Sequence, residues 1–384
     1  MTGPAQRPGG DGPATLVVAA GGGGDVIGAA MLAALAAGPG GPVHYASWSW
    51  DRLSVDPTPG PRGPQAFDGL RPVGRWNAAV GAASTPRAPY GSLLPKLASH
   101  LGIEVVLLDP EQGAAGLRRQ LGELVGLLGV GQVLVVDVGG DVLARGGEPG
   151  LASPLADFLV LAATVDLPVP VWVVVAGLGV DGEVPAAQLR GYARELGGAV
   201  PWLRLDRAAV AAFGPVFEWH PSEATGLLWL AAMGERGVAE IRGDGLRVEL
   251  DAHAADVHRF AHAAVLARNP AARALRATRS LAAAEARLVA LGLGSELELE
   301  RRKAATLGDA AASGALDVGL ALDRLRAYER AAAGRGIAFL TMRRVGEVLG
   351  LSNEGLGQLR AALRRSRHPQ YRPPVWLVAS SGRL

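Results

Sequence analysis

The first half of the chain alternates short, continuously apolar segments with longer segments of helical periodicity. The apolar segments are predicted strands at residues 15–20, 43–48, 104–108, 132–138 and 170–176. The predicted helices between them lie at residues 26–37, 93–101, 113–128, 154–165 and 185–197. Strands that are apolar on every position are buried on both faces, and helices supply that cover. The pattern therefore predicts an α/β fold with a doubly wound, mostly parallel, Rossmann-like sheet.

The second half of the chain follows a different pattern. Residues 206–235 are predicted to be mainly helical, and residues 238–250 to form a β-hairpin that turns at Gly243-Asp244-Gly245. Residues 253–332 are rich in Ala, Leu and Arg and predict further helices. Two more helices are expected within 340–366, before a short strand at 375–378.

These patterns suggest a division of the chain. We predict a disordered tail at 1–14, a Rossmann-like α/β domain at 15–250 and a mainly helical C-terminal region at 251–384. Residues 51–92, rich in Pro, Gly and Arg, are too long for a simple connection and predict a functional loop, a lid or a poorly ordered excursion.

Composition narrows the classes of protein that fit. The chain has no cysteine, which excludes disulfides, thiolate nucleophiles and cysteine-ligated metal sites. A formal net charge of +2 gives no strong bulk attraction to nucleic acid or to an anionic membrane. There is neither a secretory signal nor an uninterrupted apolar run of about 18 residues, so we expect a cytoplasmic protein without a membrane partner.

Three of the predicted strands end in loops that combine glycine with an acid, at 21–25, 137–141 and 177–183. Ligands of an open parallel sheet bind outside the carboxyl ends of its strands. The first loop contains Gly21, Gly22, Gly23, Gly24 and Asp25. It matches neither the dinucleotide fingerprint nor the P-loop, since Ala29 stands where a P-loop has lysine.

This first loop has two interpretations. Its backbone amides and the start of the following helix suit a phosphate, ribose or carboxylate ligand, with Asp25 beside it. Alternatively, the glycines only permit a tight turn and Asp25 caps the helix.

The second loop is richer in acids. Asp137 ends a buried strand, Gly139 and Gly140 form a turn, and Asp141 and Glu148 follow. Carboxylates at a sheet edge suit Mg²⁺, sugar hydroxyls or general-base catalysis. We therefore take Asp137, Asp141 and Glu148 as candidate catalytic residues, Asp137 and Asp141 as candidate metal ligands, and both glycines as candidate ligand-binding residues.

Three further residues complete the set of candidates. Ser153 is kept as a ligand-binding residue, although Ser153 and Asp157 are better explained as N-terminal caps of the 154–165 helix. His220 precedes another predicted helix and is a candidate acid or base.

The segment from Arg343 to Arg360 has the spacing of a helix–turn–helix, and the strand at 375–378 would complete a winged helix. Its second helix carries Arg360, Arg364 and Arg365. The alternative is a pair of helices that packs on the body of the protein.

The segments 21–29, 137–141 and 147–157 together resemble the DUF1152 family of archaeal and actinobacterial proteins. The resemblance covers roughly residues 15–230 through its marked motifs. The family has no assigned function, so the resemblance implies no catalytic residues. It does imply that these three segments form one site.

We therefore expect an enzyme that acts on a small anionic or sugar-bearing metabolite, phosphorylated or nucleotide-like. The missing dinucleotide fingerprint favours a transferase or hydrolase over an oxidoreductase, with Mg²⁺ as the candidate cofactor. The main alternative is a ligand-sensing regulator with a helix–turn–helix-like C-terminal segment, although the charge balance argues against nucleic acid as a partner. The sequence leaves a homo-oligomer open.

Overall fold

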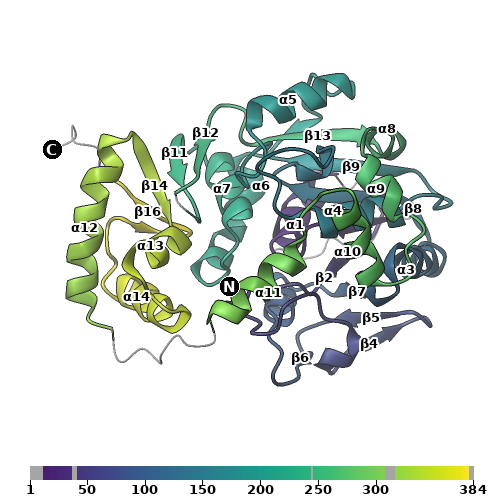
Figure 1. Cartoon of the computed structure of the whole chain (residues 1–384), viewed down its shortest axis with the longest axis horizontal. Helices are drawn as coiled ribbons and strands as arrows, with labels where there is room; N and C mark the ends of the chain where they lie inside the picture. Colours follow the sequence, from purple (N-terminus) through teal and green to yellow (C-terminus); the bar gives the residue numbers. More distant parts are fainter. Residues whose placement is uncertain (1–11, 37–40, 244, 308–315, 380–384) are drawn as a thin grey trace.

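A nine-stranded sheet forms the centre of the molecule, and a smaller sheet with the C-terminal helices lies beside it (Figure 1). The computed structural model describes residues 12–36, 41–243, 245–307 and 316–379. Most of the predicted N-terminal tail lies outside these residues. None of the helices in the described part of the chain combines the length and apolar character needed to cross a membrane.

The central sheet is parallel in its middle and antiparallel at its edges. Its strand order is β10-β13-β9-β8-β1-β2-β7-β5-β4. The strands are β1 (Ala14–Ala19), β2 (Val43–Trp48), β4 (Arg71–Val73), β5 (Asn77–Val80), β7 (Val105–Leu108), β8 (Val130–Val138), β9 (Val171–Ala176), β10 (Leu203–Arg204) and β13 (Asp256–Ala261). The five strands β9, β8, β1, β2 and β7 pair in parallel, so the predicted α/β chain with a mostly parallel sheet is confirmed.

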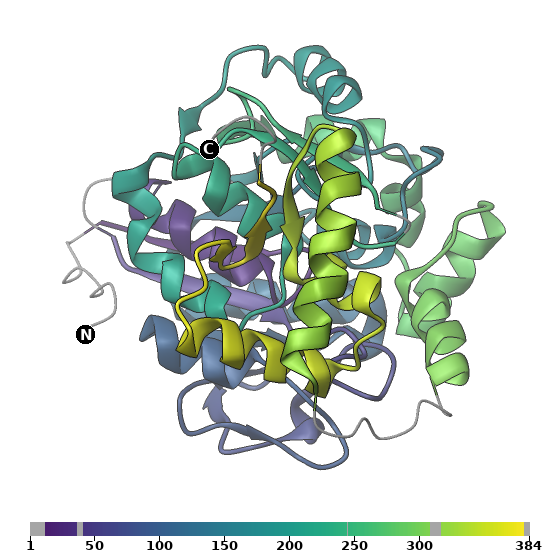
Figure 2. The ribbon, with the colours of Figure 1, turned by 90° about the vertical axis from the view of Figure 1, so that its left-hand side faces the viewer.

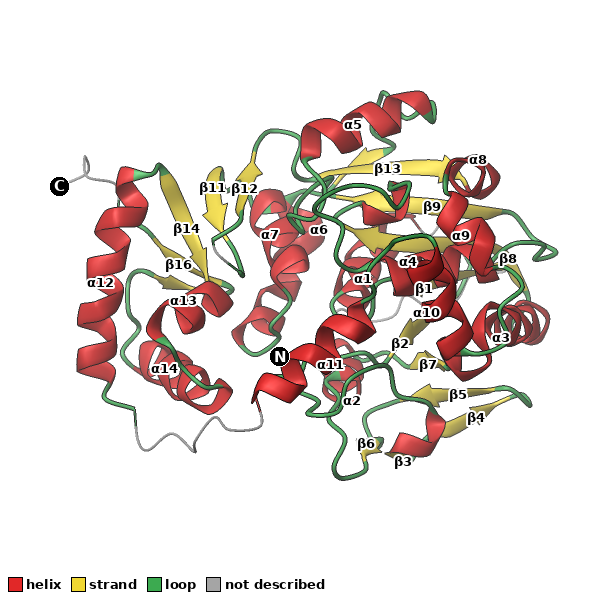
Figure 3. Ribbon diagram, in the orientation of Figure 1, coloured by secondary structure: helices red, strands yellow, loops and turns green. Residues whose placement is uncertain are grey.

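Helices cover both faces of this sheet (Figure 3). One face packs against α3 (Gly113–Leu127), α4 (Pro154–Ala163), α5 (Ala186–Glu195), α8 (His262–Arg268), α9 (Pro270–Leu275) and α10 (Leu281–Ala290). The other packs against α1 (Asp25–Ala36), α2 (Leu94–Leu101), α6 (Arg207–Val210) and α7 (Glu223–Ala232). Within β8, Val133 and Val135 face the first set of helices, while Leu134 and Val136 face the second. This two-sided burial explains why the strand is apolar at nearly every position.

Two segments differ from their predictions. Within 51–92 the chain forms β4 and β5, which extend the central sheet beyond β7, and a separate pair of short strands. That pair is β3 (Phe67–Asp68) and β6 (Thr85–Pro86). The predicted helix near residue 253 is wrong, because 256–261 is strand β13 paired with β9. Pairing with a distant strand overrides the local, alanine-rich composition there.

The smaller sheet joins the predicted β-hairpin to the C-terminal elements. Its order is β12-β11-β14-β16-β15. Its strands are β11 (Gly237–Glu240), β12 (Arg247–Leu250), β14 (Ile337–Thr341), β15 (Tyr371–Arg372) and β16 (Val375–Leu377). The predicted hairpin is confirmed as β11 and β12, and β11 also pairs in parallel with β14. The sheet therefore joins segments from both sides of residue 250.

The C-terminal elements form a module in front of the main body (Figure 2). The remaining helices are α11 (Glu296–Leu307), α12 (Val318–Gly334), α13 (Met342–Leu349) and α14 (Asn353–Arg365). Short 3-10 turns lie at η1 (Pro64–Ala66), η2 (Pro110–Gln112), η3 (Asp141–Leu143) and η4 (Ala211–Glu218). From α12 the chain runs helix, strand, helix, helix, strand, strand, the order of a winged helix. The two helices predicted within 340–366 are confirmed as α13 and α14.

Candidate functional site

The carboxyl ends of β1 and β8 lie at the point where the order of the central strands reverses. From β1 the chain moves through α1 to β2 on one side, whereas β8 and β9 lie on the other side. The helices that follow β1 and β8, α1 and α4, cover opposite faces of the sheet. Such a switch point leaves a crevice between the two connections. Asp25, the first residue of α1, and Asp137, next to the last residue of β8, lie at this switch point.

Three aspartates meet at this point. Asp25, Asp137 and Asp157 each offer a carboxylate oxygen, and these oxygens all lie within 4.8 Å of one another. Asp25 begins α1, Asp137 ends β8, and Asp157 lies in the first turn of α4. The structure therefore brings together acids from both predicted loops, with Asp157 as a member that the sequence assigned only to helix capping.

Backbone amides donate hydrogen bonds to two of these three carboxylates. One oxygen of the third carboxylate lacks a donor among the described residues. Oδ2 of Asp25 accepts a hydrogen bond from the Gly21 amide at 2.8 Å. Oδ2 of Asp137 accepts one from the Val142 amide at 3.0 Å. Asp157 is only 3% exposed, and its Oδ1 has no hydrogen-bond partner among the described residues. A buried carboxylate oxygen without a donor is costly, and a cation would satisfy it.

Two more buried aspartates adjoin the three. Asp141 follows Asp137 by four residues and lies close enough for the two carboxylate charges to interact. Burial, followed by the charges of Asp157 and Asp137, raises the pKa of Asp141 well above its usual range. Burial, followed by the charges of Glu183 and Asp137, raises the pKa of Asp181 to about 8. The predicted candidates Asp137 and Asp141 are thus neighbours in one group of acids. We call this group the acidic cluster; it comprises Asp25, Asp137, Asp141, Asp157, Asp181, Glu183 and Glu296.

The same forces act on the three aspartates themselves. Burial raises the pKa of Asp137 to about 6. Burial and then the charge of Asp137 raise the pKa values of Asp25 and Asp157 well above their usual range. Without a bound cation, these shifts favour the protonated forms of the three carboxyl groups.

Two of the predicted glycines make room for the acids. A Cβ atom on Gly21 would lie 2.7 Å from Oδ2 of Asp25 and 3.4 Å from Oδ2 of Asp157. A Cβ atom on Gly139, whose φ is +127°, would lie 2.5 Å from the carboxyl of Asp181. Any larger residue at these positions would collide with the acidic cluster.

The other predicted glycines surround the same loops. Gly22 borders the backbone of Trp50, and Gly23 borders Asp51. Gly24 borders Ser222, and Gly140 lies beside Leu178. Their expected role in holding a ligand stays a prediction.

The start of α4 is held by glutamates. The Glu296 carboxylate accepts hydrogen bonds from the Leu155 amide at 2.8 Å and the Ala156 amide at 3.0 Å. Ser153 makes no capping bond, and its hydroxyl instead hydrogen-bonds to Glu183. The expected capping by Ser153 is therefore wrong. The first amides of a helix have no partner within the helix, and here Glu296 accepts those of Leu155 and Ala156. This contact fixes the turn that carries Asp157.

The predicted catalytic residues Glu148 and His220 do not belong to the group of three aspartates whose carboxylate oxygens meet. Glu148 accepts hydrogen bonds from the Arg145 amide at 2.8 Å, the Gly146 amide at 2.9 Å and the Tyr192 hydroxyl at 2.9 Å, so it holds its own loop. His220 is buried, and burial lowers its pKa to about 3, which leaves the ring neutral. The catalytic roles predicted for both residues stay predictions.

Sequence reasoning missed several members of the cluster. Asp181 and Glu183 lie in the third glycine-containing loop, which marked the region without singling them out. Glu296 reaches α4 from 140 residues further along the chain, and no local pattern indicated it.

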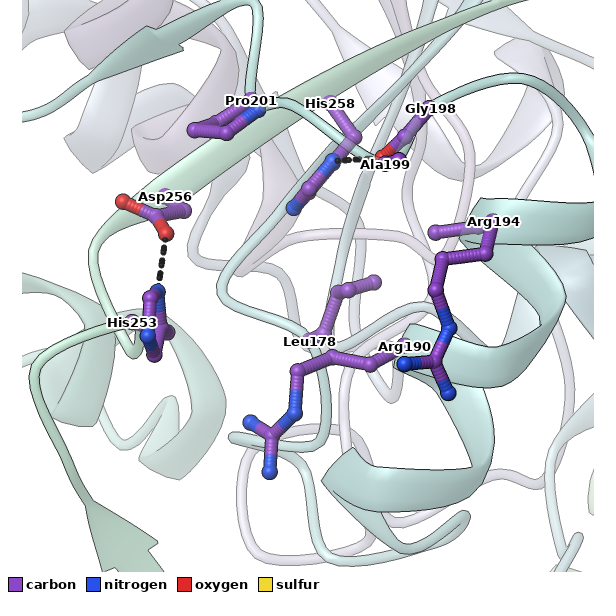
Figure 4. A pocket seen from close by; sticks show the side chains of 10 residues that line it. Leu178, Arg190, Arg194, Gly198, Ala199, Pro201, His253, Asp256 and His258 are labelled. Carbon is purple, nitrogen blue, oxygen red and sulfur yellow. Dashed lines mark hydrogen bonds and ion pairs between the residues drawn. The ribbon is translucent and has the colours of Figure 1, made fainter.

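A separate cavity lies between α5 and the start of β13 (Figure 4). Its volume is about 140 Å³, and its lining includes Arg190, Arg194, His253, Asp256 and His258. His253 and His258 are already bonded, to the Asp256 carboxylate at 2.8 Å and the Gly198 carbonyl at 3.1 Å respectively. None of the predicted site residues lines this cavity, so it is distinct from the acidic cluster.

The fold and the cluster together define an α/β protein with a largely buried group of carboxylates at the switch point of a mostly parallel sheet. The DUF1152 family model, described as a protein of unknown function, matches residues 16–304, and the chain belongs to this family. Comparison with curated proteins and with solved structures gave no match in either set. The matched residues include every member of the acidic cluster and end within α11.

Proposed function

We propose that the chain is a metal-dependent enzyme of the doubly wound, Rossmann-like class that acts on a small phosphorylated or nucleotide-like metabolite. The reaction would be group transfer or hydrolysis at the acidic cluster. The observation that carries this proposal is the meeting of Asp25, Asp137 and Asp157 within 4.8 Å, with a buried oxygen of Asp157 that lacks a partner among the described residues.

The chemistry of these donors fits Mg²⁺. Magnesium prefers carboxylate oxygens and usually keeps water and substrate phosphate among its ligands. The cluster contains no nitrogen or sulfur donor among the three meeting groups, as expected for a hard cation. A divalent cation would also offset the mutual repulsion that raises the pKa values of Asp25 and Asp157, after the larger effect of burial.

Asp141 suits proton transfer beside this metal site. Burial, followed by the charges of Asp157 and Asp137, raises its pKa well above the usual range and so favours the protonated carboxyl, and Asp137 is a nearby carboxylate. A group that holds a proton at working pH serves as a general acid, and its ionised form serves as the base. We assign this role to Asp141, in keeping with its selection from the sequence.

Metal binding is the first test. Titration of the full chain with Mn²⁺ or Mg²⁺ in a calorimeter should give saturable binding, which Asp157→Asn should weaken at least about tenfold, the factor that corresponds to 1.4 kcal/mol. Asp323→Asn is the matched control, because Asp323 is 72% exposed on α12 and remote in sequence from the cluster. Binding unchanged in Asp157→Asn, or absent from the wild-type chain, would refute the metal site.

Activity is the second test. The wild-type chain should turn over members of a panel of sugar phosphates and nucleotides in the presence of Mg²⁺. Asp141→Asn should retain metal affinity but lose turnover, since it keeps the shape of the protonated acid without its proton transfer. A variant with full turnover would remove Asp141 from the mechanism.

The C-terminal module supports the regulator hypothesis less well. Its helix and strand order suits a winged helix, but two arginines of its second helix are used against the main body. Arg364 pairs with Glu218 at 3.1 Å, and Nε of Arg360 is buried. A salt-dependent mobility shift on DNA would favour the regulator hypothesis over the enzyme.

A further inference from the structure

Four cationic side chains from four separate segments converge beside the acidic cluster. Arg52 follows β2, Arg242 follows β11, Lys303 lies on α11, and Arg343 lies in the first turn of α13. We call these four residues the cationic rim. None of them was a candidate from the sequence, where an individual arginine among so many carries little information.

Ion pairs with one shared carboxylate hold two members of the rim together. Arg242 and Arg343 both approach the buried Oε2 of Glu223, with Nη1 atoms at 3.5 Å and 3.6 Å. Their side chains are only 17% and 32% exposed. Two guanidinium groups that share one carboxylate must lie close together. Each has one further carboxylate partner, Glu183 for Arg242 and Glu347 for Arg343 at 3.4 Å.

Arg52 and Lys303 lie near this pair and reach the surface. Partial burial, followed by the charges of Arg343, Arg52 and Arg242, lowers the pKa of Lys303. Burial also lowers the pKa of Arg343, and Arg52 and Arg242 add to that effect while Glu223 opposes it. Arg52 and Lys303 are exposed, so the rim opens to solvent. Their mutual repulsion would fall if an anion bound among them.

A glutamate connects the rim to the acids. Nη2 of Arg242 lies 3.3 Å from Oε1 of Glu183. Oε2 of Glu183 accepts hydrogen bonds from the Ala152 amide at 2.8 Å and the Ser153 amide at 2.9 Å, just before the helical turn that carries Asp157. Glu183 therefore contacts both the rim and the segment that leads into the turn of Asp157, which makes the rim and the three aspartates neighbours.

We propose that the cationic rim binds the phosphate or diphosphate group of the substrate, while the reacting end of the same molecule reaches the acidic cluster. Guanidinium groups bind phosphate oxygens in pairs, and a lysine adds a compact charge. This proposal rests on the proposed function for its substrate, and it names the substrate class as a metabolite with a terminal phosphate or diphosphate. It also makes α13, outside the residues matched by the family, a part of the site.

Pyrophosphate binding to the full chain tests the rim. Calorimetric titration with pyrophosphate, in chelator without metal, should show binding by the wild-type chain. Arg52→Gln and Lys303→Gln should each weaken it about tenfold, as expected for loss of a charge-assisted contact. Both side chains are exposed, so neither change should disturb folding, and circular dichroism checks this.

Arg302→Gln is the matched control. Arg302 neighbours Lys303 on α11, is 65% exposed and lies 3.7 Å from Glu298 on its own helix. The Arg302→Gln variant loses the same charge as Lys303→Gln. Its affinity for pyrophosphate should differ from that of the wild-type chain by less than about twofold, within the range of surface effects. Equal affinities for Lys303→Gln and Arg302→Gln, or no pyrophosphate binding by the wild-type chain, would overturn the proposal.

Mn²⁺ affinity separates this proposal from the proposed function. The rim variants should bind Mn²⁺ as the wild-type chain does, and Asp157→Asn should lose Mn²⁺ while still binding pyrophosphate without metal. A wild-type chain that binds pyrophosphate through the rim but no Mn²⁺ would refute the metal-dependent enzyme and support the rim. A wild-type chain that binds Mn²⁺ but no pyrophosphate would refute the rim and support the metal site.

Discussion

Replacing Asp181 by asparagine tests whether the acidic cluster holds protons in the folded protein. Asp181 is 7% exposed. Burial, followed by the charges of Glu183 and Asp137, raises its pKa from 3.8 to about 8. Its Oδ1 accepts the Glu183 amide at 3.1 Å, and the side-chain oxygen of asparagine can accept the same bond. Asparagine therefore imitates the protonated acid and removes only its titration.

The sign and size of the effect follow from proton linkage. Between the two pKa values the folded protein keeps a proton on Asp181 that the unfolded chain has lost. The stability present at low pH therefore falls as pH rises through this window, by about 1.4 kcal/mol per pH unit for each retained proton. Across two pH units below the folded pKa, this loss of stability amounts to about 3 kcal/mol. Asp181→Asn abolishes the loss, because asparagine does not titrate.

Urea denaturation in chelator at a series of pH values measures the difference. The free energy of unfolding of Asp181→Asn should gain about 3 kcal/mol on the wild-type chain across two pH units towards neutrality. Asp323→Asn, at the exposed control position on α12, should keep the wild-type pH profile. A difference between Asp181→Asn and the wild type that stays constant with pH would show that Asp181 is already ionised, and would refute the reasoning.

Three further predictions concern the metal and the packing around it. Mg²⁺ should raise the melting temperature more at pH 8 than at pH 6, because the coordinating carboxylates must lose their protons; equal shifts in thermal scans at both pH values would contradict this. Gly28→Ala should destabilise the protein by about 1–3 kcal/mol in urea titrations, since the new Cβ would lie 2.4 Å from Cγ2 of the buried Val138, and a gain in stability would show that α1 moves freely. Glu296→Ala should cost about 1–3 kcal/mol by leaving the amides of Leu155 and Ala156 without their acceptor; Glu298→Ala on the same helix is the control.

The central strands could be predicted because burial on both faces leaves a local trace. Residues 132–138 are apolar at nearly every position, and the structure assigns them to β8. Strand β13 left no such trace, since its pairing of His258 with Val175 joins segments far apart in the chain. Long-range pairing of this kind outweighs local propensity and is invisible to a window of neighbouring residues.

The acids of the cluster divide in the same way. Asp25 and Asp137 could be selected because each directly follows or ends a predicted strand. Asp157 was assigned to helix capping because Ser153 and the adjacent proline imitate an ordinary helix start. The actual acceptor for that helix is Glu296, which only tertiary structure brings there.

The donors that are already occupied indicate where an anionic substrate would bind. The start of α4 offers a partial positive charge, but the Leu155 and Ala156 amides are bound to Glu296. The Gly21 amide before α1 is bound to Asp25, whose carboxylate would repel a phosphate. We expected the backbone amides of the first loop to bind phosphate. The Gly21 amide is not available for this, because it already donates to Asp25. In the proposed enzyme, positive charge for an anionic substrate would therefore come from a metal on the aspartates and from the cationic rim, and one ligand would contact both proposed sites.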